Sequence, residues 1–225
     1  EEVDGFEVPP PEPLVGVPLS ALPPWGATVA SISAGIVGDP FAEDSELHGS
    51  GNHSDDTAVA SGSAPRPPPF AVDPEVNGKV VLWQGELCSL EVDALIAPSA
   101  AGFTTGASTV FSTIARHGGK DLRSELKHVD SCRSGEARLA KAYNLPCRWL
   151  LLTVGPKYKD KYLVAAENTL NSCYRESLQL LVEAELRTVG VPCCWYNKGY
   201  PPEEQAHVGL RTVRRCIEKL RSAID

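Results

Sequence analysis

The turn Gly85-Glu86 places one carboxylate between two short apolar runs, residues 79–84 and 90–98. A carboxylate at the edge of a sheet accepts hydrogen bonds and suits an exocyclic amine such as that of adenine. The second apolar run is followed at once by Ser99 and Ala100, and the run itself includes Ala97, so side-chain amides that could bind a ribose are missing there. An alanine side chain neither donates nor accepts a hydrogen bond. The sequence therefore predicts an amine-binding acid beside a strand end that lacks sugar-binding groups.

Strand-like and helix-like patterns alternate along residues 71–225 and would position that acid. The apolar run Trp149–Val154, followed by Gly155-Pro156, is typical of a buried central strand and a turn. Apolar residues recur at three- and four-residue spacing across 165–186 and again across 200–221, which predicts two amphipathic helices. Further expected elements are strands at 79–84, 90–98 and 188–194, and a helix over 108–127 broken at Gly118-Gly119.

This alternation predicts a three-layer α/β/α sandwich with a mixed sheet. Ligands of such folds gather at the loops beyond the carboxyl ends of the strands. We therefore expect ligand contacts from three loops, residues 98–108, 155–162 and 195–201.

The composition divides the chain into two parts. The formal charge of the 225 residues is −8, but residues 1–70 alone carry eleven acids and a single base, Arg66. An acidic segment rich in Pro, Ser and Gly buries too little apolar surface to offset its ordering entropy. We therefore expect residues 1–70 to be disordered and residues 76–225 to form one domain with its own core.

Seven scattered cysteines form no C-x-x-C pair and have no histidine at metal-ligand spacing, so the sequence predicts no metal site and no disulfide framework. Five of them lie among apolar residues and are interpreted as core residues of a reducing compartment: Cys88, Cys132, Cys147, Cys173 and Cys216. A redox role is the minor alternative for the vicinal pair Cys193-Cys194. The absence of methionine indicates a fragment or an internally excised chain.

The basic cluster Arg211, Arg214 and Arg215 has two interpretations. A solvated helix face is the main one, and nucleic-acid contact is the minor one. The sequence has no apolar run of transmembrane length and no charged-then-apolar leader at its start, so we expect an intracellular, cytoplasmic protein without membrane insertion.

Ordered motifs over about residues 76–221 resemble the macro domain family. In that family a Gly-Asp turn precedes a strand V-D-A-I-V-N-A-A-N, a later strand ends in H-T-V-G-P, and a second loop ends in an aromatic and Y-P. The matching segments are residues 85–86, 90–96, 132–137, 143–146, 153–156, 173–175, 199–201 and 210–214. A narrower set, residues 22–26, 77–83 and 155–159, resembles a subgroup in which the macro domain precedes a CRAL-TRIO (Sec14-like) lipid-binding domain outside this chain.

The resemblance implies binding of ADP-ribose or of ADP-ribosylated protein. Glu86 stands where the family has its adenine-binding acid, and Ala97 and Ala100 stand where it has ribose-binding amides. Of the glycine-rich phosphate loop only Gly106 is left, and the second loop is shorter and lacks the S-T-G motif. The ligand-binding residues that the resemblance implies are Glu86, Leu87, Ala97, Ala100, Gly106, Val154, Gly155, Asn197, Lys198, Gly199 and Tyr200.

Three functions remain open at this stage. The first is a degenerate macro module with weak or lost ADP-ribose binding that serves as an interaction or regulatory domain. The second is an ADP-ribose reader that uses Glu86 and the backbone of the loops. The third is an ADP-ribosyl hydrolase, which would need the positioned water that the missing amides hold in the family. We assign no catalytic residue and no cofactor. The family's final strand, expected after the last helix, is absent from the sequence, which predicts reduced stability.

Overall fold

The computed structural model describes residues 14–22, 73–99, 102–103, 109–130, 132–193 and 199–225. The chain divides into two compact units, residues 23–82 and the remainder. The predicted disorder of residues 1–70 lies outside the described residues except at 14–22.

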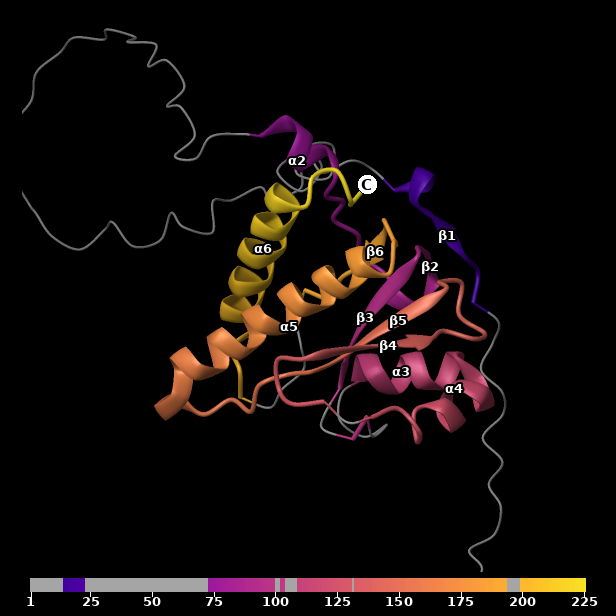
Figure 1. Ribbon diagram of the computed structural model, residues 1–225, viewed down its shortest axis with the longest axis horizontal. Coiled ribbons are helices and arrows are strands. Elements are labelled where there is room, and N and C mark those ends of the chain that lie inside the picture. The colour runs from indigo at the N-terminus through magenta and orange to yellow at the C-terminus, as the bar shows by residue number, and fades with distance from the viewer. Residues whose placement is uncertain (1–13, 23–72, 100–101, 104–108, 131, 194–198) are drawn as a thin grey trace, which may run out of the picture. The chain divides into compact units, whose positions relative to one another are not determined.

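A four-stranded mixed sheet forms the centre of the larger unit, in the order β4-β5-β3-β6 (Figure 1). Strand β3 (Ala94–Ser99) runs parallel to both β5 (Trp149–Val154) and β6 (Val189–Gly190), whereas β4 (Ala137–Lys141) runs antiparallel to β5. Both interior strands are almost wholly apolar, as expected for strands covered on both faces. The predicted central strand at residues 149–154 is confirmed.

Helices cover both faces of this sheet and give the three predicted layers. Helices α3 (Thr109–His117) and α4 (Gly119–Glu125) lie on one face, and α5 (Leu163–Glu183) and α6 (Pro202–Lys219) lie on the other. Leu95 and Ala97 of β3 join the first core, and Ala94 and Ile96 join the second, because side chains alternate along a strand. The mixed α/β sandwich is therefore confirmed.

The helix predicted over residues 108–127 is interrupted where its glycines stand. Gly119 has a φ of 83°, a left-handed conformation that glycine adopts without the steric cost of a Cβ. The chain consequently turns between α3 and α4, and Leu122 of the second helix returns to the core.

A second, two-stranded parallel sheet corrects the prediction for residues 14–22. Strand β1 (Val17–Pro18) pairs with β2 (Leu90–Glu91), and the short 3-10 helix η1 (Leu19–Ala21) follows β1. Leu14, Val17 and Leu22 pack against the core that lies under α3. These apolar residues sit in an acidic Pro-rich context, so an averaged composition concealed their capacity to be buried.

The predicted strand over residues 79–84 is wrong. Helix α2 (Pro74–Gly78) ends just before it, with its first turn capped by the Asp73 carboxylate. Residues 80–84 have no regular secondary structure, and the described strands of the sheet offer them no pairing partner. An apolar run forms a strand only where a neighbouring strand completes its hydrogen bonds, so the run alone misled.

One carboxylate organises the amino end of β3. Asp93 accepts hydrogen bonds at Oδ2 from the backbone N–H groups of Arg187 (3.0 Å) and Thr188 (3.1 Å) and from the Thr188 hydroxyl (3.1 Å). The Asp93 N–H in turn donates to Thr188 Oγ1 at 2.8 Å. Arg187 also pairs with the Asp225 carboxylate, and the Asp225 N–H donates to the Arg187 carbonyl at 3.1 Å. Asp93 therefore joins β3 to the segment that leads into β6.

Candidate functional site

The carboxyl end of β3 carries no side-chain amide. Ala97 is fully buried and belongs to the core under α3, opposite Leu152 of β5 in register. Pro98 and Ser99 follow it and are also buried. The methyl group of Ala97 thus fills a space in the core at the position where the resemblance implied an amide toward a sugar.

The backbone at this strand end is engaged within the protein. The Gly155 N–H donates to the Ser99 carbonyl at 3.4 Å. The Val154 carbonyl accepts from the Gly135 N–H at 2.9 Å and from the Cys173 thiol at 3.3 Å. The Ser99 hydroxyl is buried and has no hydrogen-bond partner among the described residues. Ser99 is a polar group that we did not assign to the site, although its place at the end of a predicted strand gave the signal.

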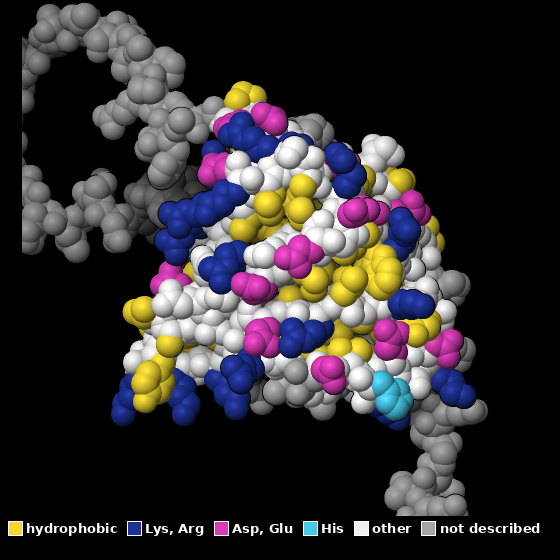
Figure 2. Space-filling view, in the orientation of Figure 1, with side chains coloured by type: hydrophobic (Ala, Val, Ile, Leu, Met, Phe, Trp, Pro, Cys, Tyr) yellow, Lys and Arg dark blue, Asp and Glu magenta, His cyan; other side chains and the backbone are white. Residues whose placement is uncertain are grey.

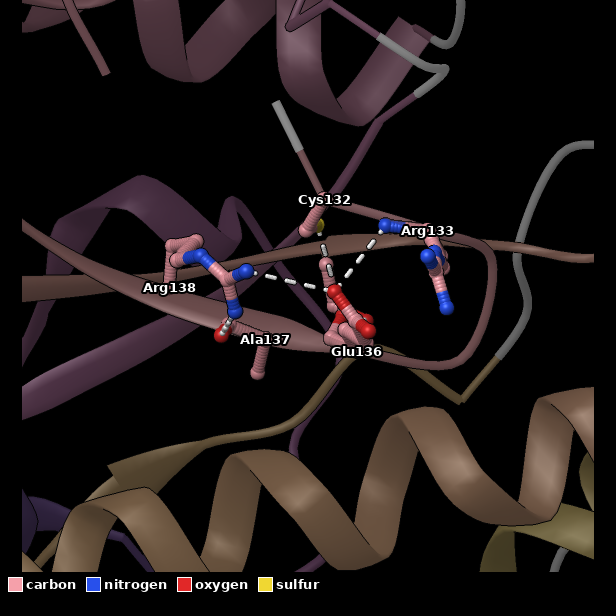
Figure 3. Close-up of polar contacts among 6 residues, drawn as sticks. Cys132, Arg133, Glu136, Ala137 and Arg138 are labelled. Carbon is pink, nitrogen blue, oxygen red and sulfur yellow. Dashed lines mark hydrogen bonds and ion pairs between the residues drawn. The ribbon is translucent and has the colours of Figure 1, made fainter. Parts of the chain in front are cut away.

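The turn at residues 132–136 braces this end of β5 (Figure 3). The Glu136 carboxylate accepts hydrogen bonds from the Arg133 N–H at 3.1 Å and from the Arg138 guanidinium at 3.2 Å. The Glu136 carbonyl accepts from the Thr153 hydroxyl at 2.8 Å. Gly135 has a φ of 94°, and a Cβ there would lie 3.2 Å from Ser172 of α5, so glycine is required. The turn is a structural brace that fixes its neighbour Val154.

The predicted residues Gly199 and Tyr200 form a second part of the site with a residue that we did not predict. The rings of Tyr200 and Tyr158 stack with their centroids 4.5 Å apart and their planes at 21°. The Tyr200 carbonyl accepts from Gln205 Nε2 at 2.8 Å, which holds the loop to the start of α6. Burial raises the pKa of the Tyr200 phenol, as do nearby carboxylates, and its hydroxyl has no partner among the described residues. No spacing in the sequence indicates that residues 158 and 200 meet.

The predicted adenine-binding acid is exposed. Glu86 precedes the 3-10 helix η2 (Leu87–Ser89), and its carbonyl accepts from the Ser89 N–H (3.0 Å) and hydroxyl (2.7 Å). Leu87 is half-buried, and a Cβ at Gly190 of β6 would lie 3.4 Å from its side chain. Burial raises the pKa of the Cys88 thiol, and the Glu86 carboxylate raises it further. Glu86 is thus held at a fixed turn, with its side chain directed away from the core.

Several predicted ligand residues lie outside the described residues, namely Ala100, Gly106, Asn197 and Lys198. Of the others, the structure brings Val154 and Gly155 together with the end of β3, and Gly199 and Tyr200 together with Tyr158.

The other sequence predictions concern groups outside these loops. The five cysteines expected in the core are buried, and Cys193 is exposed. Arg211 of α6 pairs with Glu167 of α5 at 2.8 Å, and Arg214 pairs with Glu218 at 3.1 Å. Both signs of charge are interspersed over the visible face of α5 and α6 (Figure 2), which fits the solvated-face interpretation.

Two searches were confined to the described part of the chain. It holds no group of three or more His, Cys, Asp or Glu side chains able to bind a metal ion. Among its helices, none combines the length and the apolar character needed to cross a membrane.

The family model of the macro domain matches residues 100–208. Among curated proteins, a homologue of ganglioside-induced differentiation-associated protein 2 from Nematostella vectensis is 43% identical over 161 residues, covering 70% of this chain and 32% of the relative. The Homo sapiens protein of that name is 42% identical over 170 residues, covering 74% and 34% respectively. The chain thus spans about a third of the length of the curated relatives it matches.

Solved structures agree with these relatives. The crystal structure of the macro domain of ganglioside-induced differentiation-associated protein 2 matches with a TM-score of 0.70 and 34% identity, covering 95% of this chain and 87% of that one. A Trypanosoma brucei macrodomain in complex with ADP-ribose matches with a TM-score of 0.61 and 30% identity, covering 67% and 62%. The chain therefore belongs to the macro domain family, of the type found in ganglioside-induced differentiation-associated protein 2.

Proposed function

We propose that this chain is a degenerate macro module with weak or lost ADP-ribose binding, and that it acts as an interaction or regulatory domain. The observation that carries the proposal is the buried methyl group of Ala97 at the end of β3. A ribose hydroxyl removed from water needs a hydrogen-bond partner, and a methyl group supplies none. Each missing partner weakens the binding of a polar ligand.

The state of the neighbouring backbone supports the same proposal. Gly155 directs its N–H to the Ser99 carbonyl, so this donor serves the sheet instead of a ligand. The Val154 carbonyl is likewise engaged by Gly135 and Cys173. A ligand at this edge would have to displace bonds that stabilise the fold.

A functional ADP-ribose reader is the second candidate, and the exposed carboxylate of Glu86 favours it. The solved Trypanosoma brucei relative is a complex with ADP-ribose. An exposed acid at a fixed turn is able to accept from an adenine amine, so recognition of the base would survive without the ribose contacts. A hydrolase has less support, because Ala97 has no group that positions a water molecule.

Isothermal titration calorimetry with ADP-ribose tests the proposal. We expect no saturable heat at millimolar ligand, which corresponds to a binding free energy weaker than about −4 kcal/mol. The informative variant is Ala97→Asn/Ala100→Asn, which returns both amides. With about 1 kcal/mol for each hydrogen bond, it should bind roughly thirtyfold more tightly than the parent chain.

Glu86→Gln is the matched control, because it keeps the shape of the side chain and removes only the charge. Micromolar binding by the parent chain that Glu86→Gln abolishes would establish the reader and refute the degenerate module. Thermal unfolding of each variant checks that the added volume at the buried Ala97 site leaves the domain folded.

A further inference from the structure

Three consecutive large apolar side chains are exposed where α5 begins. Tyr162, Leu163 and Val164 are 61%, 40% and 68% exposed. Tyr162 ends the 3-10 helix η3 (Asp160–Tyr162), and the other two open α5. The other exposed large apolar residues of the described chain do not occur in consecutive runs. Single exposed apolar residues are ordinary, but a contiguous group indicates contact with something apolar.

Lysines surround this apolar group. Lys157, Lys159 and Lys161 are all exposed, and Asp160 is the single acid among residues 157–164, which leaves a formal charge of +2. The first turn of α5 has no acidic residue and no side-chain cap. At the end of α5 in the lower left of Figure 1, Figure 2 shows hydrophobic side chains flanked by Lys and Arg. This surface is therefore complementary to a negatively charged partner.

The loop that presents these groups is anchored at its base. Tyr158, between the first two lysines, stacks on the buried Tyr200 instead of facing solvent. The Tyr162 N–H donates to the Lys159 carbonyl at 2.8 Å and closes the turn. Lysines and apolar side chains are thus held together at one projecting corner, with little freedom to fold back.

We propose that residues 157–164 dock the protein on the surface of an anionic lipid bilayer. The lysines contact the headgroups, and Tyr162, Leu163 and Val164 enter the boundary between headgroups and acyl chains. Basic residues beside exposed aromatic and aliphatic side chains have this combination of affinities. A stable protein interface needs about 800 Å² from each partner, usually on a flat or concave surface. A bilayer requires only a projecting corner, which is what the chain presents.

Co-sedimentation with vesicles tests this surface in the whole chain. The lipids are phosphatidylcholine alone and phosphatidylcholine with about one-third phosphatidylserine. We expect binding to the second kind only, and its loss as salt shortens the range of the electrostatic attraction. Equal binding to both vesicles, or binding to neither, overturns the proposal. So does retention of an acidic peptide by a chain that ignores the anionic vesicles.

Matched variants separate this surface from general charge or stickiness. Lys157→Gln/Lys159→Gln/Lys161→Gln should weaken binding about a hundredfold, at roughly fivefold for each lysine. Leu163→Ser/Val164→Ser should weaken it at least about tenfold. The controls are Lys120→Gln/Lys127→Gln on exposed positions of the α4 region and Val15→Ser, whose side chain is 83% exposed. Equal losses in the controls, or none in the first two variants, refute the assignment.

Discussion

Replacement of Asp93 by alanine tests the polar junction at the amino end of β3. The Asp93 carboxylate accepts from two backbone N–H groups and one hydroxyl, and its oxygen Oδ1 lies 3.9 Å from Arg148. About a quarter of the side chain is exposed, so most of this network is shielded from water. Alanine removes the acceptor and leaves the N–H groups of Arg187 and Thr188 without it.

The expected cost follows from these three hydrogen bonds. A hydrogen bond to a charged group contributes about 1.5–3 kcal/mol, and bonds that share one acceptor do not add. With partial solvent access, we expect Asp93→Ala to lower the free energy of unfolding by about 3 kcal/mol. For a domain of this size that corresponds to a fall in Tm of about 6–12 °C. Asp93→Asn keeps an oxygen acceptor without the charge and should cost about half as much.

The pH dependence gives an independent signature. Burial alone would raise the pKa of Asp93, but the Arg187 and Thr188 N–H groups, the Thr188 hydroxyl and Arg148 together hold it below its usual range. A carboxyl with a lowered pKa stabilises the fold fully above its unfolded pKa, near 3.9, and loses that contribution as pH falls through the folded value. The stability difference between the parent chain and Asp93→Asn should therefore be constant from about pH 5 to 8 and shrink below about pH 4.

Thermal and urea unfolding followed by circular dichroism measure both effects. Asp130→Ala is the control, since Asp130 is exposed and should change stability by less than about 0.5 kcal/mol. If Asp93→Ala costs no more than this control, the network contributes nothing to stability. A pH-independent difference between the parent chain and Asp93→Asn would show that the carboxylate charge has no part in it.

Two further predictions concern buried groups on the α5 side and the thiols. Tyr174 is fully buried and its hydroxyl donates to the Pro192 carbonyl at 2.9 Å, so Tyr174→Phe should cost about 1–2 kcal/mol in urea unfolding, and an unchanged midpoint would contradict that role. Burial raises the pKa of Cys173 to about 11 and of Cys147 to about 12, and Cys193 is exposed. In a Cys194→Ser variant at about pH 8, a thiol reagent should therefore modify one cysteine rapidly and the rest only after unfolding, and rapid modification of a second would contradict the burial.

The sequence predicted the fold where each element carries its own pattern. The limits of β5 follow from an uninterrupted apolar run, and the break between α3 and α4 follows from Gly118-Gly119, whose second residue has a positive φ. The failures occur where a neighbour decides. Residues 79–84 are apolar enough for a strand but have no partner in the described sheet, and residues 14–22 are ordered because β2 offers one.

The site was less predictable because its contacts join residues far apart in the chain. Tyr158 and Tyr200 stack across two helices and a strand, and neither position reveals the other. The bond between Gly155 and the Ser99 carbonyl depends on the register of β5 against β3, which the composition of the strands does not fix. The resemblance gave the positions of candidate contacts, but only the packing shows which backbone groups are already engaged.

The two ends of β3 explain why the fold is so legible and the chemistry so reduced. At the amino end, Asp93 makes bonds that no other described side chain replaces, so a change there would be felt as lost stability. At the carboxyl end, the methyl group of Ala97 packs into the core and leaves no buried polar atom of its own unsatisfied. Loss of an amide at that position costs the fold little while it removes a contact to any ligand. Stability therefore constrains one end of the strand and ligand binding constrains the other, so a macro domain can keep its motifs and its layers while its ADP-ribose contacts are lost.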